Sequence, residues 1–257
     1  MPNTTWKIGY LNCADTAILS ASAQVGTKPV TLLVDPHPKR RWSAGLTGNA
    51  WVNLVWPEPQ TIDCVALMGS SHTWETGRCQ ITASDMPGNA DLYDSGDIPA
   101  RVDPRFGYML HVLPQPVTTR SLRLYLSDPA VAETRGGRLY VGPLWTPRYG
   151  PPLGEEWGRA PTGTQTVGRA GQTFITPGAN PRATTFGLDF ISLTDERTHL
   201  RELQRICGSE NDVLVISDSS DPNPGDVSIW GLLKNLQPPK RTYGNYWSSI
   251  FSITERL

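Results

Sequence analysis

The residue types that most often perform chemistry are scattered along this sequence. Asp218, Asp221 and Asp226 share one segment, and paired carboxylates of this kind act as acid and base in glycoside hydrolysis. The same segment is rich in Ser, Pro and Gly, however, and Asp is a common turn residue. No partner acid suited to protonate a leaving group can be named. We therefore expect these aspartates to form a loop.

The sequence gives equally little support for a catalytic site with a nucleophilic serine. Ser70, Ser71 and His72 place hydroxyls beside an imidazole, but the G-x-S-x-G turn that presents a catalytic serine is absent. No Gly-rich phosphate-binding loop occurs either. The histidines are dispersed at His37, His72, His111 and His199. We expect a protein that is not an enzyme and that carries no cofactor.

Metal binding has one candidate segment. Several aspartates lie close together there, and hard cations prefer carboxylate oxygens. These residues are Asp85, Asp91, Asp94 and Asp97. The acidic spacing of a calcium-binding EF-hand loop is absent, so turn formation explains them better and we expect no metal.

The cysteines also lack metal-site spacing. Cys13, Cys64, Cys79 and Cys207 are far apart and form no C-x-x-C pair. Reduced, structural thiols are the expectation. Cys64 and Cys79 are predicted to lie in adjacent strands, so a disulfide between them is an open alternative.

Charge and hydropathy exclude some partners. Lys and Arg number 23 against 24 Asp and Glu, so the net charge of -1 gives no field that attracts a polyanion. Lys39-Arg40-Arg41, beside Trp42, is the only compact basic run, and we interpret it as a solvated surface. No apolar run approaches the roughly 20 residues that span a bilayer. We expect no nucleic acid partner, no membrane insertion and, without a visible signal peptide, a cytoplasmic origin.

The elements that position these residues are predicted to be mainly β-strands. The chain has 24 Gly and 23 Pro, which favours short strands joined by turns. Up to residue 146, apolar runs recur between turns, as in an antiparallel β-sandwich or jelly roll. The runs are Thr31–Val34, Trp51–Trp56, Ile62–Met68, Arg78–Ala83, Tyr108–Leu113 and Leu122–Leu126.

The order of these runs resembles the discoidin-type (coagulation factor 5/8 C-like) domains. The resemblance rests on Trp42, Trp51-Val52-Asn53-Leu54, a Pro turn and Ile62–Gly69, and it continues at Arg120–Leu126 and Gly137–Trp145. It implies a β-sandwich over residues 1–146 with loops at one end that bind sugars or lipid head groups.

The candidate ligand residues lie in or beside the predicted loops. Trp74 is in the polar segment Gly69–Gly77, where a large ring has no obvious core to enter, and a pyranose stacks on such a ring. An alternative is that Trp74 closes the end of the sandwich or contacts another subunit. The candidate set for glycan or subunit contact is Trp42, His72, Trp74, Glu75 and Arg78.

A linker and a second domain follow. Pro147–Gly154 has a composition that rarely forms a strand interior, and residues 147–170 are predicted to be a linker or arm, with an exposed hairpin at Gly163–Gly171. Residues 171–257 should form a β-sheet with one α-helix at about 194–207. Thr194 is its expected N-cap, and Gly208 follows its end.

The strands expected around this helix include one with Phe186, Leu188 and Phe190 inward, and a last strand over Tyr246–Ile253. In the last strand Trp247, Ile253 and either Ile250 or Phe251 should point inward. The remaining strands are Val213–Ile216 and Val227–Leu233.

This element order resembles the belt domain of distal tail and related minor tail proteins of long-tailed bacteriophages. The matching residues are Thr194, Glu196, Leu200 and Leu203 in the helix, Ile229-Trp230-Gly231, and the closing Thr254-Glu255-Arg256-Leu257. The domain order departs from that family, which carries its ring-forming domain first. The resemblance implies a structural protein of the virion tail tip, assembled in the host cytoplasm as a homo-oligomeric ring with other tail proteins. The alternative is a carbohydrate-binding module for host-surface glycans.

Overall fold

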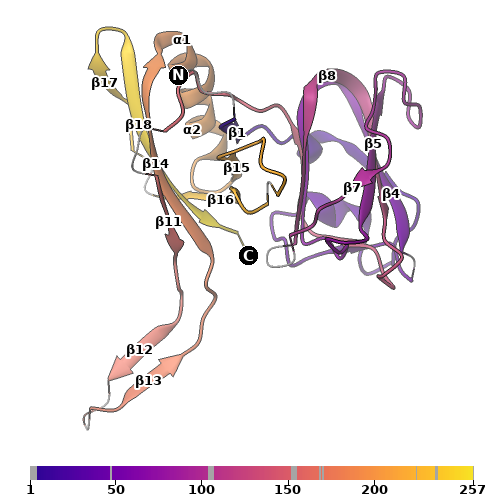
Figure 1. The fold of residues 1–257 in the computed structure, drawn as a ribbon, viewed down its shortest axis with the longest axis horizontal. Helices are drawn as coiled ribbons and strands as arrows, with labels where there is room; N and C mark the ends of the chain where they lie inside the picture. The colour runs from indigo at the N-terminus through magenta and orange to yellow at the C-terminus, as the bar shows by residue number, and fades with distance from the viewer. Residues whose placement is uncertain are drawn as a thin grey trace. The chain divides into compact units, whose positions relative to one another are not determined.

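The computed structural model describes residues 5–46, 48–103, 107–151, 155–167, 169, 171–223, 225–234 and 237–256. Its elements are mainly β-strands with one helical segment, as predicted, and they form two compact units (Figure 1). The sandwich unit comprises Gly9–Trp145 and Ser217–Ser228, and the helix-bearing unit comprises Met1–Ile8, Thr146–Ile216 and Ile229–Leu257. In the described part of the chain, no helix is both long and apolar enough to cross a bilayer.

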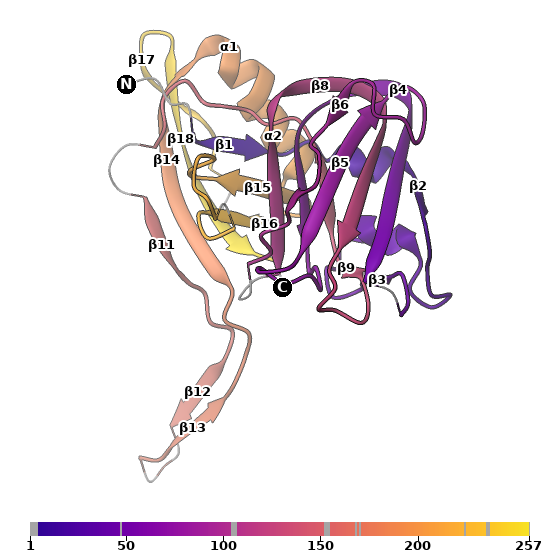
Figure 2. The same ribbon diagram turned by 45° about the vertical axis from the view of Figure 1, so that its right-hand side comes forward.

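The sandwich unit is built on one antiparallel sheet with the order β10-β4-β8-β5-β6, in which β2 also pairs with β4 and β7 with β5. Figure 2 shows β4, β5 and β8 of this sheet side by side. The strands are β2 (Ile18–Ala21), β4 (Asn49–Met68), β5 (Arg78–Ser84), β6 (Tyr93–Asp94), β7 (Ile98–Pro99), β8 (Tyr108–Ser127) and β10 (Leu139–Gly142). A separate pair joins β3 (Trp42–Ser43) to β9 (Arg135–Gly136), and the turns η1 (Cys13–Thr16) and η2 (Val30–Val34) are 3-10 helices.

Two long strands fold this sheet over on itself. The sequence predicted two short strands in the place of β4 and two in the place of β8, but β4 and β8 are each one continuous strand of 20 residues. The register between β4 and β8 shifts between Val55 and Gln60. Pro57, Pro59, Pro114 and Pro116 lie at this bend, where each lacks the N–H that a regular ladder requires. The first and last residues of β4 and β8 therefore all lie at the end of the unit that is opposite this bend. We call this end the loop end.

Two expectations about this unit were wrong. Thr31–Val34 belongs to η2 rather than to a strand, since an apolar pair three residues apart, Val30 and Leu33, buries one side of a helical turn. Cys64 and Cys79 are not on adjacent strands, because β8 lies between β4 and β5. Both thiols are free and buried.

The helix-bearing unit has a sheet with the order β1-β15-β16-β18-β14-β11, and β17 pairs with β18. Its strands are β1 (Lys7–Gly9), β11 (Glu156–Arg159), β14 (Arg182–Ser192), β15 (Asp212–Ile216), β16 (Ser228–Lys234), β17 (Lys240–Tyr243) and β18 (Tyr246–Glu255). The domain boundaries predicted from sequence therefore differ from the units. The N-terminal β1 pairs with β15, and residues 217–228 group with the sandwich unit.

The predicted helix is present as α1 (Leu193–Asp195), the π-helical turn η3 (Glu196–Leu200) and α2 (Arg201–Cys207). Its apolar stripe is buried at Leu200 and Leu203. The N-cap is Ser192 rather than Thr194, because the Ser192 hydroxyl accepts the Asp195 amide at 3.0 Å. Gly208 follows the helix with a φ of 50°, as a C-terminal glycine should.

One face of the β14–β18 pair is open. Phe190 was expected inward, but a bulge between Leu188 and Ile191 turns it outward at a φ of 56°, and it is 58% exposed. In β18 it is Phe251 that is buried, whereas Ile250 is 53% exposed. Gly187 of β14 pairs with Ile250, and a side chain added at Gly187 would find no other atom within 4 Å of its Cβ.

An arm extends from β11 and β14 (Figure 1). It is the hairpin of β12 (Thr164–Val167) and β13 (Thr173–Thr176), which pair only with each other and are exposed throughout. The predicted linker is thus partly structured, because β11 joins the sheet. Residues 152–154 of that linker, together with Gly168 and Ala170 of the hairpin, lie outside the described residues.

The closing segment makes ion pairs with its own unit. Glu255 is buried and accepts a hydrogen bond from Arg182 Nη2 at 2.8 Å. Arg256 Nη1 lies 2.6 Å from Asp212 Oδ1. The segment is therefore held within its own unit, and Leu257 lies outside the described residues.

Candidate functional site

The loops at the loop end form one hydrogen-bonded body. The Ser71 amide donates to the Arg135 carbonyl at 3.2 Å, and the Asp128 amide donates to the Gly48 carbonyl at 2.9 Å. The Ser70 amide donates to Gly107 at 3.2 Å. Because these bonds join segments that are far apart in sequence, side chains from separate loops share one surface.

Asp128 organises the loop that carries most of the predicted site. Its buried carboxylate accepts hydrogen bonds from the Thr73 amide at 2.6 Å, the Thr73 hydroxyl at 2.9 Å, the Thr76 hydroxyl at 2.6 Å and the Ala130 amide at 2.9 Å. Burial raises the pKa of Asp128, but these four bonds outweigh it and lower the pKa to about 2. The carboxylate therefore stays charged and holds the segment around Thr73–Thr76 in one conformation.

Two of the predicted ligand residues are part of the core. Trp42 lies in β3, is fully buried, and donates from Nε1 to the Ala23 carbonyl at 3.3 Å. It was expected beside a loop, but pairing with β9 turns it inward, so it cannot present its ring to a ligand. His72 is also buried, with Nδ1 3.0 Å from Ser70 Oγ, and burial lowers its pKa.

The other three predicted residues reach the surface. Trp74 and Glu75 lie in the turn between His72 and β5, where Trp74 is half-buried and Glu75 is exposed. Arg78 begins β5 and is engaged with Asp97, to which its Nε donates at 3.0 Å. The structure thus leaves the half-buried Trp74 and the exposed Glu75 as the part of the predicted set that can meet a ligand.

A basic pocket of 570 Å³ lies at the same end. It is lined by Thr27, Lys28, Leu32, Lys39, Arg40, Arg41 and Arg135. A Cβ on Gly69 would lie 3.2 Å from Arg41 Nε, so the Arg41 guanidinium lies against the start of the loop that carries Trp74. Such a pocket can bind an anionic group by charge-assisted hydrogen bonds.

Two carboxylates hold cations of this pocket in place. Glu133 accepts hydrogen bonds from Arg135 and from the Ser43 hydroxyl, and it lies 3.7 Å from Lys28 Nζ. These hydrogen bonds, with the Arg135 and Lys28 charges, lower the pKa of Glu133 to about 2. Asp35 lies 3.2 Å from Arg40 Nη1.

Sequence reasoning missed most of this pocket. Lys39-Arg40-Arg41 was noted and interpreted as a solvated surface, but Lys28 and Arg135 carried no local signal. The pairing of β3 with β9, between segments far apart in sequence, brings Arg135 to that run.

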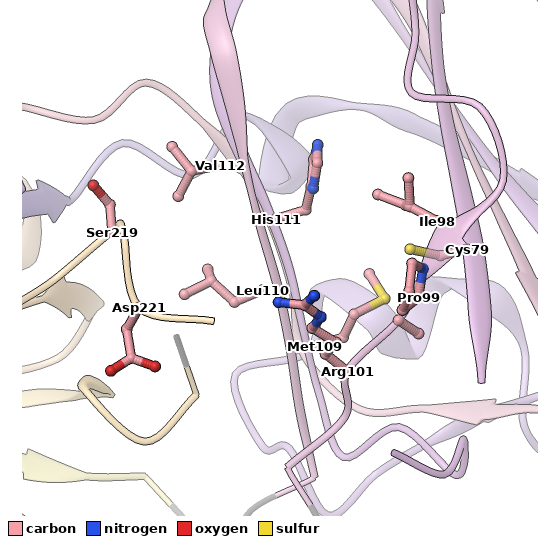
Figure 3. A pocket seen from close by; sticks show the side chains of 11 residues that line it. Cys79, Ile98, Pro99, Arg101, Met109, Leu110, His111, Val112, Ser219 and Asp221 are labelled. Carbon is pink, nitrogen blue, oxygen red and sulfur yellow. The ribbon is translucent and has the colours of Figure 1, made fainter. Parts of the chain in front are cut away.

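A second pocket, of 300 Å³, lies against β7 and β8 in the sandwich unit (Figure 3). Leu110 and Val112 lie on the side of Ser219 and Asp221, whereas His111 and Cys79 lie on the other side of the strand, so the polar groups do not converge. Burial, with the Asp97 charge, raises the pKa of Cys79 to about 12, which leaves its thiol protonated. Among the residues that the structure describes, no group of three or more His, Cys, Asp or Glu is placed to hold a metal.

No protein-family model matches this chain, and no curated protein matches it either. Among solved structures, a pectin-binding carbohydrate-binding module is 17% identical, with a TM-score of 0.38, over 49% of this chain and 89% of the module. Chitosan-binding module 1 of a Paenibacillus sp. IK-5 chitosanase/glucanase is 14% identical, with a TM-score of 0.41, over 52% and 99%. A family 32 carbohydrate-binding module of NanJ from C. perfringens, in complex with galactose, is 10% identical, with a TM-score of 0.41, over 51% and 96%. About half of the chain is thus similar to carbohydrate-binding modules, and the tail-tip resemblance stays a prediction.

Proposed function

We propose that the sandwich unit binds a carbohydrate at its loop end. The observation that carries the proposal is the pocket at that end, whose walls come from loops that hydrogen bonds join into one body. The volume of 570 Å³ is in the range of small-ligand sites. The discoidin-type resemblance of the sequence implies a ligand at the same place.

Trp74 lies on the loop that starts at Gly69, next to Arg41 of this pocket, and gives the loop end a ring on which a sugar can stack. It is half-buried, so its body packs on the unit while part of the indole faces solvent, and Glu75 beside it offers a carboxylate to sugar hydroxyls. Asp128 holds this segment in one conformation, so the segment loses little conformational entropy when a ligand binds.

Affinity electrophoresis on a panel of bacterial and plant polysaccharides tests the proposal. We expect at least one polysaccharide to retard the protein, and Trp74→Ala to abolish the retardation with an unchanged circular dichroism spectrum. Trp157→Ala is the matched control, because Trp157 is exposed on β11 in the other unit. A flat response across the panel would reject carbohydrate binding.

A specific observation also favours an assembly role, which is the structural function predicted from the tail-tip resemblance. The arm exposes Val167, Phe174 and Ile175 by 60% or more, and Arg169 is the one charged residue between 160 and 181. An isolated two-stranded hairpin is marginally stable in water, and exposed strand edges are usually protected by charge. The arm therefore suits packing against another copy of the chain.

Light scattering of the purified protein tests this second role. We expect an oligomer that Phe174→Ser with Ile175→Ser converts to monomers, whereas Ile18→Ser, at an exposed position of the sandwich unit, leaves the mass unchanged. A wild-type monomer at all concentrations, also with other tail proteins present, would reject the assembly role.

A further inference from the structure

The basic pocket concentrates charge that the rest of the chain lacks. The whole sequence has a net charge of -1, yet five cations line this one pocket. They come from segments at residues 28, 39–41 and 135, which only the fold brings together. Low-dielectric walls around like charges strengthen the local field, so the pocket attracts anions although the chain as a whole does not.

Part of this charge is fixed in position before any ligand arrives. Glu133 contacts both Arg135 and Lys28, and the Ser43 hydroxyl holds the carboxylate from its other side. The pKa of Glu133 is lowered to about 2, so the carboxylate that makes these contacts stays charged well below neutral pH. These contacts place Lys28 and Arg135 on either side of one carboxylate along the wall.

The remaining charge is free to meet a ligand. Lys39 and Arg41 are exposed, and within the described residues neither makes an ion pair with an acid. Arg41 lies against the backbone at Gly69, which directs its guanidinium to the loop that also carries Trp74. An anion that enters the pocket thus meets two unneutralised cations, one of which lies against the first residue of the loop that carries Trp74.

Building on the proposed carbohydrate function, we propose that the ligand is an acidic polysaccharide whose carboxylate, sulfate or phosphate groups bind Lys39 and Arg41. Sugar rings next to the bound anionic group would then contact the Trp74 loop. Arginine suits this role because its planar fork matches the geometry of an oxyanion.

The pocket fits such a ligand better than it fits nucleic acid. Nucleic acid binding takes a row of phosphate contacts along an extended backbone, and its affinity rises with the number of phosphates neutralised. Here the cations surround a single concavity. A short stretch of sugars carrying one or two acidic groups matches this shape.

Calorimetry with polygalacturonate and with its methyl-esterified form tests the proposal, because the two polymers differ in charge on one backbone. Dextran sulfate against dextran forms a second pair that distinguishes sulfate from carboxylate. We expect the acidic member of at least one pair to bind roughly tenfold or more tightly than its neutral partner, and less tightly as salt rises. Lys39→Gln with Arg41→Gln should remove most of that difference.

The matched control is Arg120→Gln with Lys240→Gln. It changes the net charge equally at two exposed positions, one at the bend of the sandwich unit and one in the other unit, and it should leave the affinity unchanged. Circular dichroism confirms that both double variants fold.

The outcomes separate this inference from the proposed function. Equal binding of charged and neutral partners, or binding that the pocket variant does not weaken, would overturn the acidic ligand while leaving carbohydrate binding intact. Equally tight binding of duplex DNA, lost in the same variant, would also overturn it, since the pocket would then be a general polyanion site. No binding of any polysaccharide would reject both.

Discussion

Replacing Asp128 by asparagine tests how the loop end is held. The buried carboxylate accepts four hydrogen bonds, two of them from the amides of Thr73 and Ala130. Asparagine keeps one acceptor oxygen but turns an NH₂ group toward donors, so it loses about half of these bonds. A hydrogen bond to a charged group contributes about 1.5–3 kcal/mol, so losing two of the four bonds should lower the free energy of unfolding of the sandwich unit by about 3–6 kcal/mol.

The pKa of Asp128 gives a second estimate. Its pKa is lowered from 3.8 to about 2 in the folded protein, so the folded state favours the charged form. This stability is fully present above about pH 4 and is lost as the pH falls through about 2, and it amounts to roughly 2 kcal/mol. This figure is smaller than the one from the hydrogen bonds, because it counts only the preference of the folded state for the charged over the neutral carboxyl group.

Urea unfolding between pH 7 and pH 2 measures this effect, and hydrogen exchange at the Thr73 and Ala130 amides locates it. The variant should unfold at lower urea, lose part of the pH dependence between 4 and 2, and exchange both amides faster. Asp97→Asn is the control, because Asp97 is an exposed partner of Arg78 and such pairs contribute little. An Asp128→Asn protein with the wild-type midpoint and pH dependence would refute the reasoning.

Three further predictions concern other parts of the fold. Glu255→Gln should lower the free energy of unfolding of the helix-bearing unit by about 3 kcal/mol, because it leaves the buried Arg182 charge uncompensated; an unchanged urea midpoint would contradict this. Burial lowers the pKa of His72, so wild-type stability should fall as the pH drops below about 6.5, and His72→Gln should flatten that slope in urea titrations. Gly187→Val should change the free energy of unfolding, measured by thermal denaturation, by no more than about 0.5 kcal/mol, since the valine side chain would enter open space. Strong destabilisation would show that this face of the sheet is covered.

Local patterns in the sequence were enough to predict local structure. The stripe of Leu200 and Leu203, with Gly208 after it, predicted the helix, because periodicity and end signals belong to one short segment. Phe190 broke its pattern because a bulge adds one residue to β14, and nothing in the alternation itself announces a bulge.

The candidate site depended on contacts between distant segments. Trp42 was expected at the surface, but its burial follows from pairing with Gly136, which lies far along the chain. The same pairing brings Arg135 to Lys39-Arg40-Arg41, so this basic run lines a pocket together with a residue from a distant segment. The loop around Trp74 could be named from sequence, whereas its support by Asp128 could not, since it needs the register of β8.

The central claim, that the loop end of the sandwich unit binds carbohydrate, is tested most directly by hydrogen exchange mass spectrometry with and without the polysaccharide that retards the protein most. The account predicts slower exchange at residues 27–41 and 69–77, and no change at the bend around residues 114–118. Protection at the bend, or in the helix-bearing unit alone, would contradict it.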